Sequence, residues 1–125
     1  MNASQSILVV DDNASNVALL EHLLKLEGYD VRVAFDAEAA LQSISERAPT
    51  LVVTDVQLPG MSGLDLARRL KSRAGTSVIR ILAVTAFAMA ADEARALEAG
   101  CDGYVAKPID TRHFSGVVAS LLNRT

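Results

Sequence analysis

Three aspartates of this 125-residue chain stand where buried strands are expected to end. Asp11 and Asp12 come directly after the apolar residues 7–10, and Asp55 follows residues 51–54. Runs of four buried-type side chains are typical of strands that are covered on both faces. Adjacent like charges at the end of such a strand repel one another unless a partner compensates them. The sequence therefore predicts that these carboxylates hold a positively charged group.

Two further polar side chains follow predicted strands in the same way. Thr85 ends the predicted strand 79–85, and Lys107 follows residues 103–106 and precedes Pro108. Together with the three aspartates they supply three carboxylates, one hydroxyl and one ammonium, whose formal charges sum to −2. A divalent cation would bring that sum to zero.

The donor types of this set favour phosphoryl chemistry. All-oxygen ligands without histidine or cysteine select a hard ion, so we expect Mg²⁺, with Mn²⁺ as the alternative, rather than zinc. Mg²⁺ keeps several waters and shares its coordination with phosphate oxygens. Phosphoryl transfer needs a nucleophile, a metal and a cation on the developing charge, and Asp55, the metal and Lys107 would supply them.

The rest of the chain alternates predicted strands with helices. Strands are predicted at 7–10, 31–34, 51–54, 79–85 and 103–106, and Gly28, Asp36 and Asp110 mark helix ends. Five apolar stripes of helical spacing separate or follow these strands: Val17, Leu20 and Leu24; Ala37, Leu41 and Ile44; Leu64, Ala67 and Leu70; Ala90, Ala94 and Leu97; and Phe114, Val117, Val118 and Leu121.

Strict alternation with short connections predicts a doubly wound α/β fold, in which helices cover both faces of a five-stranded parallel sheet. Ligands of such sheets bind beyond the carboxyl ends of the strands. The five polar residues follow strands at that edge, so the predicted fold would bring them together.

Composition narrows the possible functions. At 125 residues the chain is long enough for one hydrophobic core, so we expect a single domain over residues 1–125. Twelve basic against fifteen acidic side chains, for a net charge of −3, argue against nucleic-acid binding. The N-terminal MNASQS fits neither a signal peptide nor a membrane span, and Cys101, the single cysteine, is expected to be buried. We expect a cytoplasmic protein without membrane contacts.

In these motifs the chain resembles the response-regulator receiver domains of two-component and phosphorelay signalling. The resemblance runs from "ILVVDDNASN" through "VVTDVQLPGMSGLDL" and "ILAVTAFAM" to "GCDGYVAKPI". The stretch that ends in "AKPI" is most similar to single-domain cell-cycle receivers and to receivers of hybrid histidine kinases. The resemblance implies the flavodoxin-like strand order 2-1-3-4-5.

The resemblance also implies roles for the polar residues. Asp55 would be the phosphoryl acceptor, Asp11 and Asp12 would bind Mg²⁺ together with Asp55, and Gln57 would lend the metal its backbone carbonyl. Thr85 and Lys107 would contact the phosphoryl group.

Thr85 would act with Tyr104 as the switch, and the Lys107–Pro108 peptide would be cis. Phosphate would come from a histidine kinase or a histidine phosphotransfer protein, so the domain would catalyse only its own phosphorylation and dephosphorylation. The chain would be a monomer or a weak homodimer whose formation is linked to phosphorylation. A downstream protein, or a second copy of the chain, would bind the face formed by the fourth helix, strand 103–106 and the helix after Asp110. Phe87 and Met89 are expected to contribute apolar contacts there.

Other interpretations of the same residues remain open. A phosphohydrolase of similar fold would usually carry a second aspartate two residues after its nucleophile, where this chain has Gln57. A receiver that no longer accepts phosphate would be a pure binding module, against which the complete acidic set argues. Asp12 alone could be a helix cap, and His22 is expected to lie on a solvated helix face.

Overall fold

Five strands alternate with five helices along the chain. The computed structural model describes residues 5–86 and 90–123. Each predicted strand is present, within one residue of its expected ends. The strands are β1 (Ser6–Val10), β2 (Asp30–Ala34), β3 (Leu51–Asp55), β4 (Arg80–Thr85) and β5 (Gly103–Ala106). The helices are α1 (Ala14–Leu26), α2 (Ala37–Glu46), α3 (Gly63–Lys71), α4 (Ala90–Glu98) and α5 (Thr111–Leu122).

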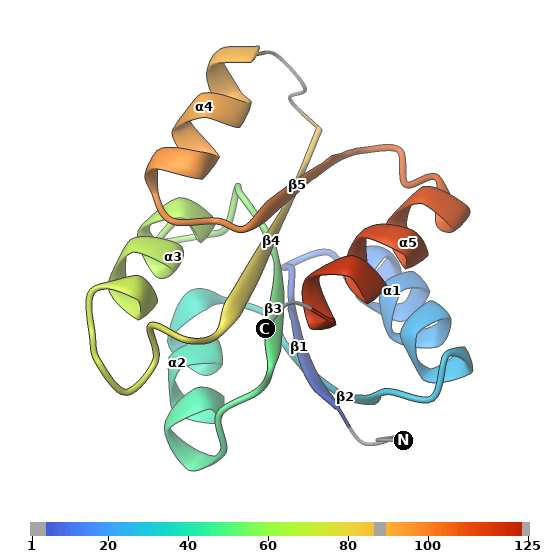
Figure 1. The fold of residues 1–125 in the computed structure, drawn as a ribbon, viewed down its shortest axis with the longest axis horizontal. Coiled ribbons are helices and arrows are strands. Elements are labelled where there is room, and N and C mark those ends of the chain that lie inside the picture. The colour runs from blue at the N-terminus through green and yellow to red at the C-terminus, as the bar shows by residue number, and fades with distance from the viewer. Residues whose placement is uncertain (1–4, 87–89, 124–125) are drawn as a thin grey trace.

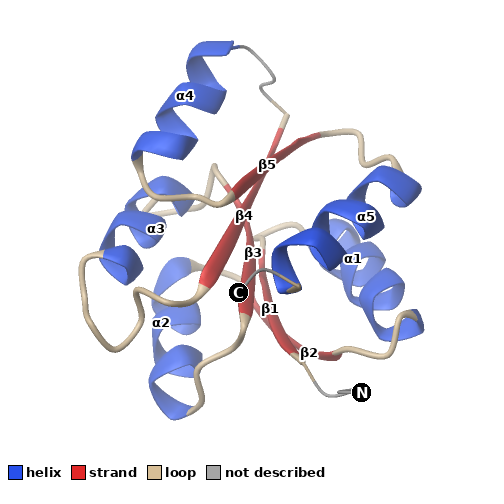
Figure 2. Cartoon of the chain, viewed as in Figure 1, coloured by secondary structure: helices blue, strands red, loops and turns tan. Residues whose placement is uncertain are grey.

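The strands form one parallel sheet with the order β2-β1-β3-β4-β5. The helices α1 and α5 cover one face of this sheet, and α2, α3 and α4 cover the other (Figure 1). Colouring by secondary structure shows the sheet between the two helical layers (Figure 2). The predicted doubly wound α/β fold and its strand order are therefore confirmed.

The two faces of the sheet bury separate apolar clusters, because successive strand residues point to opposite sides. One cluster joins Ile7 and Val9 to Leu24 of α1 and Phe114 of α5. The other joins Leu8 and Val10 to the inner faces of α2, α3 and α4. All four residues of β1 from position 7 to position 10 are fully buried, as expected of a strand with helices on both sides.

Local signals in the sequence determine where several helices begin and end. Asp36 accepts a hydrogen bond from the Ala39 amide at 2.7 Å and so caps α2. Asp110 caps α5 by accepting from two amides of its first turn. Gly28, which follows α1, has a φ of +92°, a conformation that L-residues with side chains rarely adopt.

The predicted inner stripes are correct for four helices and wrong for α4. Val17, Leu20 and Leu24 of α1 are buried, and the stripes of α2, α3 and α5 are buried or packed against the core. In α4, however, Leu97 is 55% exposed and Ala94 is exposed, whereas Ala96 and, just past the helix, Ala99 are buried. The side chain of Ala90, like Phe87 and Met89, lies outside the described residues.

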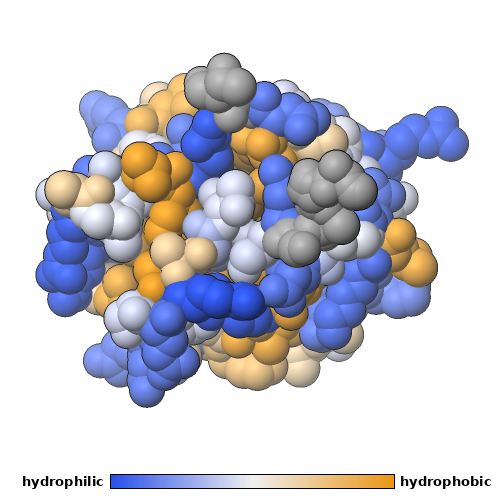
Figure 3. Space-filling view, turned by 60° about the horizontal axis from the view of Figure 1, so that its bottom comes forward, coloured by the Kyte–Doolittle hydropathy of each residue, from blue (hydrophilic) through white to orange (hydrophobic). Residues whose placement is uncertain are grey.

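Other surface and burial predictions agree with the structure. Cys101 is buried and His22 is exposed. Figure 3 brings forward the side of the molecule where β1, β3 and β4 begin, and hydrophobic residues lie there in patches separated by hydrophilic ones. Among the described residues, no helix is long and apolar enough to cross a membrane.

Candidate functional site

The register of the parallel sheet places the predicted site residues at one edge. Val10 of β1 lies beside Thr54 of β3, so Asp11 and Asp55, the next residues along, follow neighbouring strands at the same level. Thr85 of β4 lies beside Ala106 of β5, and its carbonyl accepts a hydrogen bond from the Lys107 amide at 2.8 Å. The site is therefore assembled by strand pairing rather than by proximity in the sequence.

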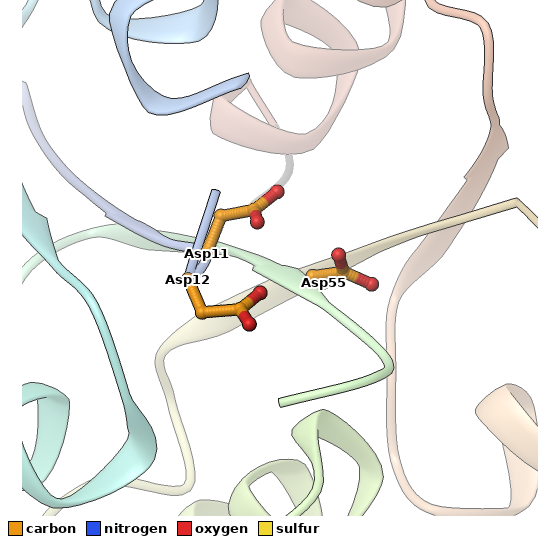
Figure 4. A group of neighbouring side chains, drawn as sticks. All are labelled: Asp11, Asp12 and Asp55. Carbon is orange, nitrogen blue, oxygen red and sulfur yellow. The ribbon is translucent and has the colours of Figure 1, made fainter. Parts of the chain in front are cut away.

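Three carboxylates converge at this edge. Asp11, Asp12 and Asp55 each offer an oxygen within 4.8 Å of the other two, and the three side chains lie close together and extend in the same general direction (Figure 4). Asp11 is 1% exposed, Asp55 is partly buried and Asp12 is exposed. The cluster thus opens to solvent on the side of Asp12.

Lys107 provides the positive charge at this cluster. Its Nζ donates to Oδ2 of Asp55 at 2.8 Å and lies 3.5 Å from Oδ2 of Asp11. Burial lowers the pKa of Lys107, but the hydrogen bond and charge of Asp55, with the charge of Asp11, outweigh it and raise the pKa overall. Lys107 therefore stays charged, and the four groups sum to −2.

Backbone amides fix the orientation of two of the carboxylates. The Gln57 amide donates to Oδ1 of Asp55 at 3.0 Å, and the Asn13 amide donates to Oδ1 of Asp11 at 2.9 Å. Both bonds join an aspartate to the amide two residues later, the arrangement of an Asx turn. The sequence motifs do not single out these two donors, although an aspartate that ends a strand and begins a loop is a general signal for them.

The donor set fits a hard divalent cation. Three carboxylates lie within reach of one ion, without a histidine or cysteine among them, and one lysine neutralises only part of their charge. Oxygen ligands of this kind suit Mg²⁺ or Mn²⁺. Gln57 is exposed and follows the cluster directly; the role of its carbonyl as a further ligand stays a prediction.

Thr85 and Tyr104 lie together beside the acidic cluster. Thr85 is 2% exposed, at the end of β4, and Tyr104 of β5 is partly buried. Both line a cavity of about 510 Å³, together with Asp92 and Arg95 of α4. Burial, and then the charges of Asp92 and the neighbouring Glu93, raise the pKa of the Tyr104 hydroxyl, while Arg95 opposes this change.

The bond between Lys107 and Pro108 is cis, as expected. The predicted site residues Asp11, Asp12, Asp55, Thr85 and Lys107 thus meet at the carboxyl ends of β1, β3, β4 and β5, whereas Tyr104 lies within β5. Asp11, Asp12, Asp55 and Lys107 form the acidic cluster and its counter-charge, and Thr85 and Tyr104 form the adjoining cavity wall.

Comparison with known proteins agrees with this arrangement. The family model described as the response regulator receiver domain matches residues 7–119. The polar-differentiation response regulator DivK of Brucella ovis is 36% identical over 119 residues, which are 95% of this chain and 97% of that protein.

Solved structures give the same result. A Chloroflexus aurantiacus protein assigned as a response regulator has a TM-score of 0.93 at 34% identity, with 97% of this chain and 99% of that chain covered. The receiver domain of a signal transduction histidine kinase from Syntrophus aciditrophicus has a TM-score of 0.88 at 30% identity, with 97% and 94% covered.

The sequence motifs indicated single-domain cell-cycle receivers and receivers of hybrid histidine kinases. The similar proteins include the polar-differentiation response regulator DivK and the receiver domain of a signal transduction histidine kinase. Receivers of this family work in phosphorylation-dependent signalling with histidine kinases or phosphotransfer proteins. They are signalling modules rather than enzymes that turn over an external substrate, and they bind Mg²⁺ at an acidic cluster. The match to the family model and the geometry of the strand ends lead to one conclusion: this chain belongs to the response regulator receiver domains.

Proposed function

We propose that this chain is a phosphorylation-dependent switch in which Asp55 accepts a phosphoryl group from a phosphohistidine. The donor would be a histidine kinase or a histidine phosphotransfer protein. The observation that carries the proposal is the placement of the Asp55 carboxylate, which lies 2.8 Å from Lys107 Nζ and within 4.8 Å of oxygens of Asp11 and Asp12. We also propose that residues 1–125 form one receiver domain.

The proposed step is a displacement at phosphorus. An oxygen of the Asp55 carboxylate forms a bond to phosphorus as the bond from phosphorus to the donor histidine nitrogen breaks, and the histidine keeps the electron pair of that bond. Lys107 Nζ then bonds to a phosphoryl oxygen, where it offsets the developing negative charge.

The other residues hold or read the transferred group. Mg²⁺, held by Asp11, Asp12 and Asp55 with the Gln57 carbonyl, would offset charge on the phosphoryl oxygens. The backbone amide of Gln57 holds one Asp55 oxygen in place. The Thr85 hydroxyl lies at the end of the neighbouring strand, where it would bond to a phosphoryl oxygen.

Output would pass from Thr85 to Tyr104 and then to the face formed by α4, β5 and α5. Tyr104 lines the same cavity of about 510 Å³ as Thr85, which offers space for the ring to turn inward. An inward turn would change the outer surface of β5 and its contacts with α4. A downstream protein, or a second copy of the chain, would bind this face.

The proposal is tested by exposing the protein to phosphoramidate and Mg²⁺. Phosphoramidate carries a phosphorus–nitrogen bond like that of phosphohistidine. Intact mass should show one added phosphoryl group, with the acid and base lability of an acyl phosphate, and Asp55→Asn should show none. The exposed Asp65 of α3 offers a matched control, and Asp65→Asn should form the adduct like the wild type.

Two other outcomes would contradict the proposal. Turnover of unrelated phosphomonoesters would indicate a phosphohydrolase. The absence of an adduct with every donor, including a cognate kinase, would indicate a binding module that no longer accepts phosphate.

A further inference from the structure

Gly63, the first residue of α3, packs directly against the main chain of Asp55. A Cβ atom at position 63 would lie 2.0 Å from the Asp55 carbonyl oxygen, 2.9 Å from the Asp55 carbonyl carbon and 3.0 Å from the Val56 Cα. Cβ atoms in proteins do not approach backbone atoms within such distances. Any side chain at position 63 therefore has to displace either the start of α3 or the Asp55–Val56 peptide.

The Asp55–Val56 peptide is held from several sides. The Thr54 hydroxyl donates to the Asp55 carbonyl at 3.0 Å. The Val56 amide donates to the Val84 carbonyl at 3.1 Å, and the Gly63 amide donates to the Val56 carbonyl at 2.9 Å. The first two bonds hold the Asp55–Val56 peptide, and the third joins the next peptide, Val56–Gln57, to the start of α3. The two consecutive peptides therefore have little room to move without losing a bond.

Backbone conformation does not explain the glycine at this position. Gly60, in the same loop, has a φ of +75°, whereas Gly63 is not among the glycines with positive φ. Position 63 therefore needs glycine because of the close approach and not because of its φ. Helix propensity alone would favour alanine over glycine here, so propensity and packing predict opposite effects of one substitution.

We infer that Gly63 is a positioning residue for phosphoryl transfer: its missing side chain lets α3 close on the main chain of Asp55 and fixes where the Asp55 carboxylate stands. A shift of this peptide would move the carboxylate relative to Lys107 Nζ, now 2.8 Å away, and to the Gln57 amide at 3.0 Å. The inference rests on the proposed role of Asp55 as the phosphoryl acceptor.

Gly63→Ala tests the inference against two matched variants. Gly116→Ala places the same change in α5, where a Cβ meets nothing within 4 Å. Ile44→Val removes one methyl group from a buried side chain near the end of α2, which leads to the start of β3 and not to its Asp55 end, and so reports a mild loss of stability alone. Each variant is measured for its rate of adduct formation with phosphoramidate, its Mg²⁺ dissociation constant and its unfolding in urea.

Misplaced reacting atoms slow reactions steeply, so Gly63→Ala should form the adduct roughly 10- to 100-fold more slowly than the wild type. Its Mg²⁺ binding should weaken as well, because Asp55 is one of the three clustered carboxylates. Gly116→Ala and Ile44→Val should keep wild-type rates and affinities. A wild-type rate and affinity in Gly63→Ala, or an equal loss in Ile44→Val, would overturn the inference.

Thr54→Val perturbs the Asp55–Val56 peptide in a second way. It removes the hydroxyl that donates to the Asp55 carbonyl and keeps the side-chain shape, so it should slow the adduct in the same direction by a smaller factor. If Gly63→Ala does not fold, an unchanged rate in Thr54→Val overturns the inference.

Failure of the proposed function gives a different pattern of results. A wild-type protein that forms no adduct would contradict the acceptor role of Asp55. The ¹³C shift of the Asp55 carboxylate and the Mg²⁺ titration would still show whether Gly63→Ala moves that carboxylate.

Discussion

At the scale of single residues, charge balance dominates the site. Asp11 is almost fully buried, and Asp55 is partly buried beside it. A buried carboxylate without a partner is strongly destabilising, and Lys107, with the amides of Asn13 and Gln57, supplies the partners. Asp12 has the greatest exposure of the three carboxylates, so it can bind a cation from solvent at the least cost in lost hydration.

The first prediction concerns Asp12 and Mg²⁺. Saturating Mg²⁺ should stabilise the wild-type protein by mass action, by about 2.7 kcal/mol at a hundredfold excess over the dissociation constant. Asp12→Ala should lose most of this stabilisation because one of the three clustered carboxylates is gone. Urea unfolding with and without Mg²⁺ measures the effect.

Glu46→Ala is the control, since Glu46 is an exposed carboxylate at the end of α2. It should keep the full Mg²⁺ effect. An Asp12→Ala protein that Mg²⁺ stabilises as much as the wild type would contradict the assignment of Asp12 to the metal site.

The second prediction concerns the thiol of Cys101. Burial, and then the charge of Asp102, raise its pKa from 9.0 to about 11, against the opposing charges of Lys71 and Arg68. Between these two values the unfolded chain has lost the thiol proton and the folded chain has kept it, so stability falls as pH rises. The difference of about two pKa units corresponds to about 2–3 kcal/mol.

Urea unfolding at pH 8, 9, 10 and 11 measures this loss in the wild type and in Cys101→Ala. The alanine variant should start lower, because it leaves a small cavity, and should decline less steeply above pH 9. Parallel curves for the two proteins would show that the thiol does not contribute.

At the scale of elements, the helices differ in how firmly they are packed. Leu20 and Leu24 anchor α1, whereas Ala96 is the buried residue of α4 among its described side chains, with Ala99 just beyond the helix. Burial of leucine contributes about 1.5–3 kcal/mol, and alanine contributes much less. The α4 helix is therefore expected to open more readily than α1.

Native-state hydrogen exchange should show this difference. Amides of α4 should exchange through local opening at a lower free energy than those of α1, which are expected to approach the global value. Equal protection of the two helices would contradict the prediction and would weaken the case for α4 as the element that responds to phosphorylation.

The same contrast explains which elements the sequence predicts well. Large aliphatics at helical spacing specify the inner face of α1. The α4 segment carries several alanines and one leucine, so spacing alone could not distinguish the face of Ala94 and Leu97 from the buried face. Packing against the sheet determines which face of α4 is buried.

The site residues also differ in how well the sequence predicts them. The strand ends predicted Asp11, Asp55, Thr85 and Lys107 because each follows a recognisable apolar run. The Gln57 and Asn13 amides and the contact of Gly63 depend on loop backbone geometry. An aspartate that ends a strand is a general signal for the two amides, but residue types alone do not reveal the contact of Gly63.

At the scale of the whole molecule, the sheet connects the acidic cluster to the proposed output face. Thr85 and Lys107 stand at the ends of β4 and β5, and Tyr104 lies within β5. When two binding sites are coupled through elements that change together, the coupling free energy between their ligands is typically about 1–3 kcal/mol. Phosphate at Asp55 should therefore change partner affinity at the α4, β5 and α5 face by about 5- to 150-fold.

Thr85→Ala should separate phosphorylation of Asp55 from the change in partner affinity. It should still accept phosphate on Asp55, while the change in partner affinity, or in self-association, falls toward zero. Chemical-shift changes on phosphorylation of the wild type should extend from the acidic cluster to residues 90–106. Shifts confined to the cluster, or full coupling in Thr85→Ala, would contradict this route.

Chemical mapping of the phosphorylated residue tests directly whether Asp55 is the phosphoryl acceptor. Borohydride reduces an aspartyl phosphate to homoserine, so reduction of the adduct followed by peptide mass spectrometry identifies the acceptor. Homoserine is expected at position 55, and aspartate at positions 11 and 12. Homoserine at another aspartate, or a phosphoryl group on a histidine or serine with position 55 unchanged, would contradict the acceptor role of Asp55.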